Sequence, residues 1–250
     1  MKTDGHFRAV LCVGIGASAL LGLLGMGFLR LLPTSSECIE MACRWDGRCY
    51  SLVPLEASYP PAPCSTSRAD LDGDGVDETV RIVSGRAMLY RNGGAVWRSP
   101  RSWLVTHALF ADSNHDGRIE LNIVLWKHGT YGPDRPFFVK KPDKKWGCHL
   151  FLYAWRAKAL RCIWGASTVD FPICEAAFAD LRGDGKPDLV VLESRRGSDE
   201  HAPASYVAVW RWNGWGFTNQ FRSKRGRYTH LRIAPSGDKQ IALVRRKAHP

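Results

Sequence analysis

Three short acidic segments contain the residues of this sequence that could do chemistry. Each follows the pattern Asp-x-x-x-Asp-Gly-x-x-[Asp/Glu], and they span residues 70–78, 112–120 and 180–188. Oxygen atoms at positions 1, 3 and 5, a main-chain carbonyl at position 7 and a carboxylate at position 9 can surround a hard cation with about six to eight oxygen ligands. Glycine at position 6 permits a sharp turn. The pattern therefore predicts metal-binding loops.

The elements around these segments read as β-strands. Each segment is followed by a short run rich in apolar and β-branched residues, at 79–83, 121–126 and 189–192, and the second and third are also preceded by one. Further along lies an aromatic-rich hairpin, with its two arms at 87–90 and 95–97, 149–155 and 159–164, and 206–212 and 215–217. Asn-Gly between such runs is a strong hairpin signal because both turn positions need a positive φ. Each repeat thus predicts four antiparallel strands, the content of one propeller blade.

The two ends of the chain supply complementary halves of a further unit. Residues 228–234 and 241–244 predict its first two strands, and residues 43–53 predict a hairpin around Asp46-Gly47. We therefore expect an all-β fold, a small β-propeller of about four blades, in which N- and C-terminal strands form the fourth blade and close the ring, removing exposed sheet edges. A β-sandwich made of the same strands is the alternative.

With strands on both sides, the acidic loops resemble FG-GAP/VCBS-type repeats, the calcium-loop blades of integrin α-subunit propellers and of many bacterial surface proteins. The resemblance covers roughly residues 65–245. It implies a propeller used for adhesion or ligand binding, with structural Ca²⁺ in two loops. The ligands it implies in the first loop are Asp70, Asp72, Asp74, the carbonyl of Val76 and Glu78. Those in the second loop are Asp112, Asn114, Asp116, the carbonyl of Arg118 and Glu120.

The third loop departs from the family pattern. Arg182 stands at position 3, where the family has Asp or Asn. A guanidinium cannot bind Ca²⁺, and it could itself neutralise the remaining carboxylates. The weaker metal candidates of this loop are therefore Asp180, Asp184 and Asp188.

An uncharged apolar run from Ala9 to Leu29 predicts attachment to a membrane. As a helix it is about 31 Å long, which matches a hydrocarbon core of roughly 30 Å. A cleaved signal peptide is the alternative, but its apolar core should be shorter, about 7–15 residues, and followed by a small-residue cleavage site. We therefore expect residues 1–8 to be a short cytoplasmic N-terminus, 9–32 a transmembrane signal anchor, 33–64 a cysteine-containing segment with the closing hairpin, and 65–250 the propeller repeats.

The cysteines indicate an oxidising compartment outside the cytoplasm. Of the 8 cysteines, four lie within residues 38–64, which predicts disulfides that staple an irregular segment. The sequence contains no Cys-x-x-Cys pair, the spacing typical of zinc sites, so a zinc site is not indicated. Without Cys12 the number is odd, so at least one thiol is free or pairs with another chain.

An insertion at residues 127–148 is the candidate ligand surface. It mixes cationic and aromatic side chains, a composition suited to a protein or an anionic glycan; the alternative is that these aromatics cover the blade. The named candidates are Tyr131, Arg135, Phe137, Phe138, Lys140, Lys141 and Trp146. The net charge of +11 favours anionic surfaces, although nucleic acid is not expected for an exported chain.

The motifs favour a binding protein over an enzyme. The sequence contains no Gly-x-Ser-x-Gly, His-Glu-x-x-His or phosphate-binding loop. We expect a membrane-anchored, extracytoplasmic calcium-binding propeller that binds a protein or glycan at the cell envelope. The alternatives are a membrane-tethered polysaccharide hydrolase or lyase on the same scaffold, and a structural subunit of a membrane complex.

Overall fold

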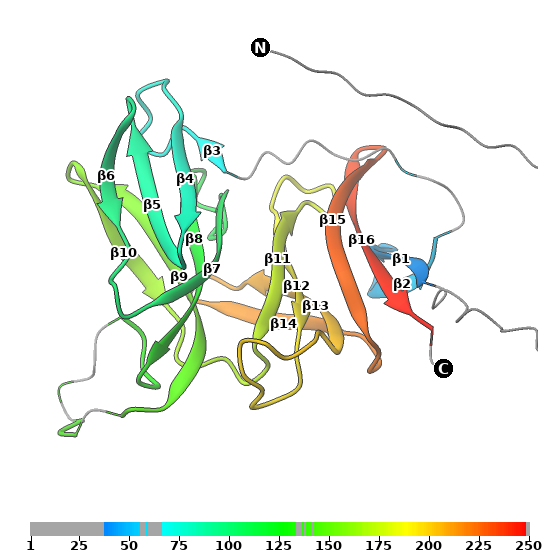
Figure 1. Ribbon diagram of the computed structural model, residues 1–250. Coiled ribbons are helices and arrows are strands. Elements are labelled where there is room, and N and C mark those ends of the chain that lie inside the picture. The colour runs from blue at the N-terminus through cyan, green and yellow to red at the C-terminus, as the bar shows by residue number, and fades with distance from the viewer. Residues whose placement is uncertain are drawn as a thin grey trace, which may run out of the picture. The chain divides into compact units, whose positions relative to one another are not determined.

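The computed structural model describes residues 38–55, 59, 67–133, 137, 139–141 and 143–248. Within these residues the secondary structure consists of β-strands, without a helix, arranged as separate four-stranded antiparallel sheets (Figure 1). Sheet I contains β3 (Arg68–Ala69), β4 (Glu78–Val83), β5 (Arg86–Arg91) and β6 (Gly94–Arg98). Sheet II contains β7 (Leu104–Ala111), β8 (Glu120–His128), β9 (Trp146–Arg156) and β10 (Ala159–Gly165). Sheet III contains β11 (Ile173–Ala179), β12 (Asp188–Glu193), β13 (Tyr206–Trp212) and β14 (Phe217–Arg222).

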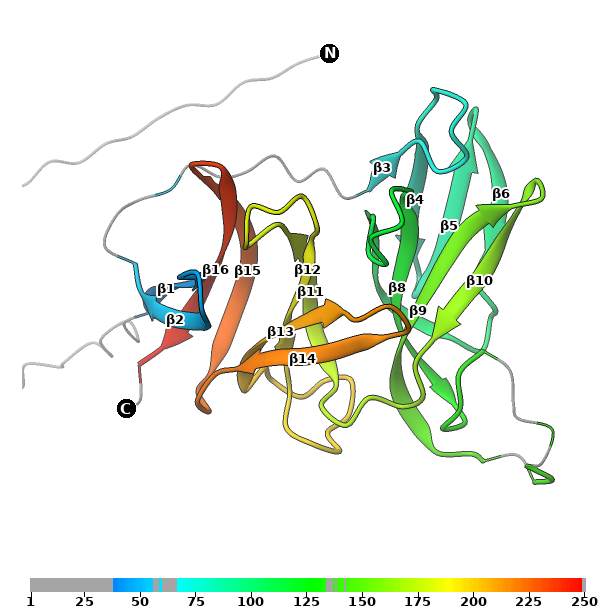
Figure 2. The same cartoon turned by 180° about the vertical axis from the view of Figure 1, so that it is seen from behind.

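Sheet IV is assembled from the two ends of the described chain. Its strand order is β15 (Tyr228–Ser236), β16 (Lys239–Lys247), β1 (Cys38–Trp45) and β2 (Tyr50–Pro54). The pairing of β16 with β1 runs from Lys247 opposite Cys38 to Ala242 opposite Cys43. Figure 2 shows β16 beside the β1–β2 hairpin. The predicted composite fourth sheet is confirmed, and four separate sheets are a propeller-like arrangement and not the alternative sandwich.

The sheets pack face to face in the order I, II, III, IV. One buried cluster joins sheets I and II around Leu89 and Phe151, a second joins II and III around Trp126 and Val191, and a third joins III and IV around Val209. Within the described residues, no buried cluster contains side chains of both sheet IV and sheet I. Closure of the ring at this seam therefore stays a prediction.

Strand composition follows from this stacking. Strand β8 in sheet II is buried at every residue from Glu120 to Lys127, because sheets I and III cover both of its faces. Strand β6, at the edge of sheet I, instead alternates between exposed and half-buried residues. Its hairpin turn with β5 uses Asn92 and Gly93, both at positive φ, as the Asn-Gly pair predicted.

Two local expectations are wrong. The strand predicted at 215–217 begins only at Phe217, because Asn213 accepts hydrogen bonds from the backbone nitrogens of Trp215 and Gly216 and draws them into a turn. Trp215, which lies in this turn, is consequently 78% exposed. The hairpin predicted at 43–53 is confirmed as β1 and β2, so the part of segment 38–64 that carries Cys43 is not irregular as the cysteine pattern predicted.

Several predictions fall on residues that lie outside the described ones. These include the signal anchor at 9–32, the N-terminus at 1–8, and Cys12, Cys64, Arg135 and Phe138. Within the described residues, the structure contains no helix with the length and apolar character that crossing a membrane requires. No disulfide joins the cysteines that the structure describes, so the predicted stapling stays unconfirmed.

Candidate metal centres

The three acidic loops connect the first and second strands of sheets I, II and III, and all lie at the upper edge of the ribbon in Figure 1. The second and third loops touch, since Nε2 of His115 lies 3.0 Å from the carbonyl oxygen of Pro187. The third loop in turn contacts the β15–β16 turn, where the backbone nitrogen of Gln240 donates to the carbonyl of Asp180 at 2.8 Å. The predicted site residues of neighbouring sheets are therefore gathered at one end of the molecule.

The loops share one backbone conformation. Position 6 has a φ of 85° at Gly75, 84° at Gly117 and 73° at Gly185, in the left-handed region that glycine enters without a steric penalty. The aspartate at position 1 holds the turn together by accepting backbone N–H groups. In the first loop Asp70 accepts hydrogen bonds from the backbone nitrogens of Gly73 and Gly75, at 2.7 and 2.8 Å.

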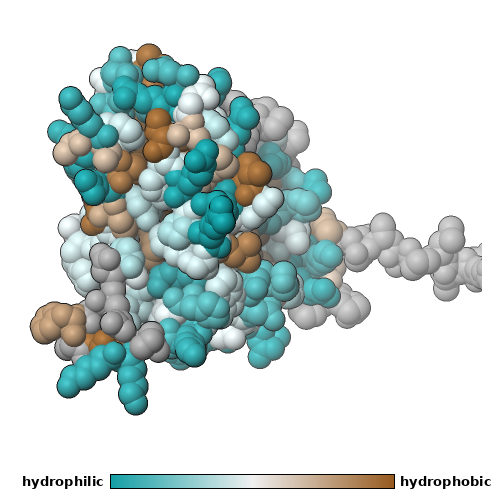
Figure 3. Space-filling view, turned by 60° about the vertical axis from the view of Figure 1, so that its left-hand side comes forward, coloured by the Kyte–Doolittle hydropathy of each residue, from teal (hydrophilic) through white to brown (hydrophobic). Residues whose placement is uncertain are grey.

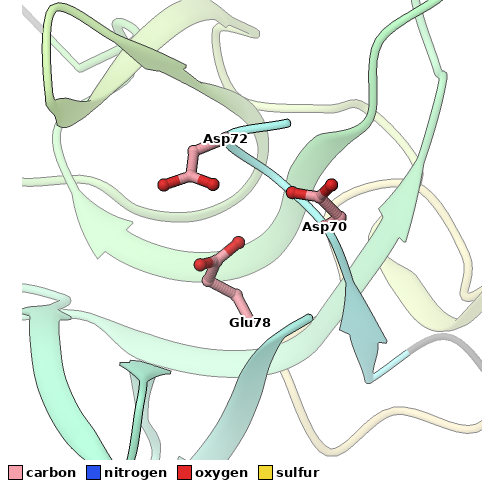
Figure 4. A group of neighbouring side chains, drawn as sticks. All are labelled: Asp70, Asp72 and Glu78. Carbon is pink, nitrogen blue, oxygen red and sulfur yellow. The ribbon is translucent and has the colours of Figure 1, made fainter. Parts of the chain in front are cut away.

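The first loop brings three of its predicted ligands together. Carboxylate oxygens of Asp70, Asp72 and Glu78 lie within 4.8 Å of one another and point into a common space (Figure 4). Glu78 is fully buried, and its Oε2 accepts a hydrogen bond from the backbone nitrogen of Leu71 at 2.8 Å. Burial is the largest cause that raises the pKa of Glu78.

An arginine from another strand faces the same carboxylates. Arg91, the last residue of β5, places Nη2 2.5 Å from Oδ2 of Asp72 and Nε 3.3 Å from Oε1 of Glu78, and it also pairs with Asp74. The hydrogen bond from Arg91 is the largest cause that lowers the pKa of Asp74. Asp74, a predicted ligand, is therefore engaged by the guanidinium and lies outside the three-carboxylate group. The sequence pattern of the loop gives no sign of this basic partner.

The second loop has a more open arrangement. Carboxylate oxygens of Asp112, Asp116 and Glu120 lie within 4.8 Å of one another. Asn114, at position 3, accepts from the backbone nitrogen of Asp116 at 2.9 Å. The nearest guanidinium contact is that of Arg156, whose Nη2 lies 3.5 Å from Oδ2 of Asp116.

Glu120 is the most unusual group in this loop. It is fully buried, and its Oε2 accepts hydrogen bonds from the backbone nitrogen and the hydroxyl of Ser113 at 2.9 and 3.0 Å. Its Oε1 is buried and has no hydrogen-bond partner. The pKa of Glu120 is raised to about 7, chiefly by burial and also by the nearby charges of Asp116 and Asp112, against the opposing effect of the Ser113 hydrogen bonds. A buried acceptor without a partner is rare in proteins.

The third loop is neutralised from within the protein. Arg211 of β13 lies 2.5 Å from Asp184 and 2.9 Å from Asp188, and the Tyr50 hydroxyl of sheet IV donates to Asp188 at 2.7 Å. Arg182 was expected to neutralise this loop, but its guanidinium lies 4.3 Å from the Trp45 ring centre and donates to the Tyr50 hydroxyl at 2.6 Å. The expectation of neutralisation is thus met by a different arginine.

The donor sets of the first two loops fit a hard divalent cation. Carboxylate, amide and carbonyl oxygens are the ligands that Ca²⁺ prefers, and two of the three carboxylates that converge in each loop lie at its two ends, which an ion would tie together. The carbonyl ligands predicted at Val76 and Arg118 stay predictions. Their backbone nitrogens donate to the carboxylates of Asp74 and Asp116, at 2.9 and 3.0 Å.

A cavity of about 460 Å³ lies between the first and second loops. Its walls include Asp70 and Asp72 from one loop, Arg118 from the other, and Trp155 and Arg156 at the end of β9. The Trp155 ring centre lies 5.6 Å from the guanidinium carbon of Arg91. An aromatic side chain therefore lies beside the first candidate metal centre and lines the cavity that the two loops share.

A second cavity, of about 230 Å³, lies between sheets II and III and was not expected from the sequence. It is lined mainly by apolar groups, with Trp164, Phe171, Trp210 and Phe217 among them. The indole nitrogen of Trp210 donates to the buried Glu193 at 2.9 Å. The lining residues come from four separate parts of the sequence, at 150, 164–173, 189 and 210–217, which is why no local motif indicated the cavity.

The predicted ligand surface divides into two parts. Trp146 stacks against Trp126 and donates from its indole nitrogen to Glu200 at 3.0 Å, so it packs against the protein. Phe137 is 98% exposed, and Lys140 and Lys141 are exposed near it in the chain, whereas Tyr131 is half-buried. Figure 3 shows the insertion protruding at the lower left, with hydrophilic side chains beside an apolar one.

Comparisons with known proteins add no relative: no family model matches the chain, and no curated protein or solved structure is significantly similar to it.

Proposed function

We propose that the protein is a calcium-binding, propeller-like interaction module. In this proposal the first and second acidic loops hold structural Ca²⁺, and the module belongs to the FG-GAP/VCBS type. The N-terminal apolar segment anchors it in a membrane, with the sheets on the extracytoplasmic side. The affinity expected for such a site is in the range of extracellular modules, about 10⁻⁴–10⁻³ M.

The observation that supports this proposal best is that the Glu120 carboxylate is fully buried and has one oxygen without a hydrogen-bond partner. A buried carboxylate beside two others is unfavourable without a compensating cation, since like charges repel and burial penalises ionisation. Oε1 of Glu120 has no hydrogen-bond partner, and the Glu120 carboxylate converges with those of Asp112 and Asp116, so an ion bound among them would supply the missing partner. A turn held only by hydrogen bonds does not require this convergence of carboxylates.

The test is the effect of calcium on the thermal midpoint of the full chain in detergent. We expect calcium to raise the midpoint relative to chelator, and the double change Asp112→Asn/Asp116→Asn to remove most of this response. The matched control is Asp170→Asn/Asp199→Asn, which removes the same charge from exposed positions outside the acidic loops. An unchanged midpoint in millimolar calcium, or an unchanged response in the loop variant, would refute the calcium assignment.

The partner proposed for the module is a protein or an anionic glycan that contacts the tip of the 127–148 insertion. Support comes from the exposure of Phe137, Lys140 and Lys141 and from the positive net charge. We expect Lys140→Glu/Lys141→Glu to weaken binding to an anionic polysaccharide, and Lys224→Glu/Arg225→Glu, exposed elsewhere, to leave it nearly unchanged. Equal effects of the two variants would show that binding depends on overall charge and not on the insertion.

A further inference from the structure

The third strand of sheets I, II and III carries an arginine at or next to its last residue. These arginines are Arg91 on β5, Arg156 on β9 and Arg211 on β13. The acidic residue at position 9 of each loop begins the second strand, which pairs with the third strand. The register between these two strands therefore decides whether the arginine faces the acidic loop.

The register differs between the sheets. Thr79 pairs with Tyr90 in sheet I and Leu189 pairs with Trp210 in sheet III, so one residue further along Glu78 lies opposite Arg91 and Asp188 lies opposite Arg211. In sheet II, Leu121 pairs with Tyr153, so the residue opposite Glu120 is Ala154. Arg156 lies two residues beyond Ala154.

The contacts follow the register. Arg91 reaches three carboxylates of the first loop, and Arg211 reaches two carboxylates of the third. Arg156 contacts only the outer Asp116 of the second loop, at 3.5 Å, and Oε1 of Glu120 is left without a partner. In sheet I the fully buried Glu78 also has an Oε1 without a hydrogen bond, although the guanidinium lies beside it.

From these contacts we infer that the arginine opposite position 9 is a built-in counter-cation that competes with the divalent ion for the acidic loop. This inference rests on the proposed function. It makes the three loops unequal: the second binds the ion directly, the first binds it only when the Arg91 guanidinium leaves, and the third stays closed. Two further features keep the ion out of the third loop: Arg182 stands where the ligand at position 3 would be, and the Tyr50 hydroxyl donates a hydrogen bond to Asp188.

The size of the effect follows from the equilibrium that Arg91 imposes. If the ion binds only to the minor state in which Arg91 has left the loop, the apparent binding constant equals the intrinsic one multiplied by the population of that state. Charge-assisted hydrogen bonds of the kind that Arg91 makes are strong enough to lower this fraction about ten- to hundredfold. Removing Arg91 should therefore tighten ion binding in the first loop by the same factor.

The experiment isolates the first loop with Glu120→Gln in the full chain, which disables the second loop. Terbium bound near Trp155 is excited through the indole ring, and calcium competition then gives the calcium affinity. We expect Glu120→Gln/Arg91→Gln to bind calcium about ten- to hundredfold more tightly than Glu120→Gln alone. Glu120→Gln/Arg156→Gln, the matched loss of charge in sheet II, should change the affinity of the first loop by less than about threefold.

The single variant Arg91→Gln provides the folding control, because its intact second loop should bind calcium as the wild type does. An Arg91→Gln change that leaves first-loop affinity unchanged or weaker, with normal binding at the second loop, overturns the inference and leaves the proposed function standing. Absence of calcium binding in the wild type and in every variant refutes the proposed function itself.

Discussion

The substitution Glu120→Gln should stabilise the protein in the absence of divalent ions, although it alters a fully buried residue. Burial and the adjacent carboxylates raise the pKa of Glu120 from an ordinary value of 4.5 to about 7. At pH 8 the ionised carboxylate therefore costs the folded state about 3 kcal/mol relative to the unfolded chain. Glutamine has nearly the same shape, keeps the acceptor for Ser113 and carries no charge. We expect the unfolding free energy in chelator at pH 8 to rise by up to about 3 kcal/mol.

The pH dependence follows from the direction of the shift. A raised pKa means that the folded state binds the proton more tightly, so the contribution of Glu120 to stability is fully present below pH 4.5 and is lost as the pH rises through about 7. The difference between wild type and Glu120→Gln should therefore shrink at pH 5. Calcium should remove most of this difference at pH 8, since saturation of the second loop to one hundred times the dissociation constant adds about 2.7 kcal/mol to the wild type. The variant should gain less, because only its first loop remains to bind calcium.

The assay is urea unfolding of the full chain in detergent, followed by tryptophan fluorescence, at pH 5 and pH 8 with chelator or calcium. Glu175→Gln is the control, because the Glu175 carboxylate accepts backbone hydrogen bonds from His230 and Leu231 far from the acidic loops. It should lose stability equally with and without calcium. If Glu120→Gln is instead destabilised in chelator at pH 8, and calcium stabilises it as much as the wild type, the reasoning about Glu120 is wrong.

Three further predictions test one of the loops and the packing of the sheets. Gly117→Ala should cost about 1–2 kcal/mol of unfolding free energy through backbone strain alone, because the φ of Gly117 is 84° and nothing lies within 4 Å of an added Cβ. Gly117→Asn should cost less, and urea unfolding of the two variants measures the difference. Arg222→Met should cost about 3–5 kcal/mol in the same assay, since it removes a partner 2.6 Å from the fully buried Glu193, and a loss below 1 kcal/mol would contradict this pairing. Trp126→Ala should lower the unfolding free energy by about 3–5 kcal/mol, because Trp126 is only 3% exposed. Trp215→Ala should lower it by less than about 0.5 kcal/mol, because Trp215 is 78% exposed, and similar losses for both variants would place Trp215 in the core.

Much of the fold could be predicted because its signals are local. In the sequence, a strand is indicated by a short apolar run, a tight hairpin by Asn-Gly, and an acidic turn by glycine at position 6. The repeat of four strands can therefore be recognised without any long-range information. The complementary half-units at the two ends even predicted that β16 pairs with β1, because an unpaired half would expose sheet edges. The turn at 213–216 was missed because the Asn213 side chain competes with the strand for its backbone groups.

By itself, the sequence determined the four-strand repeats, the composite fourth sheet and the oxygen donors of each acidic loop. Only the tertiary structure decided which cation each loop already faces. Arg91, Arg156 and Arg211 occupy similar places in the sequence, yet the strand register sets Arg91 against Glu78 and Ala154 against Glu120. Strand register depends on turn lengths, bulges and the packing of neighbouring sheets. None of these can be predicted from the residues next to the arginine in the sequence.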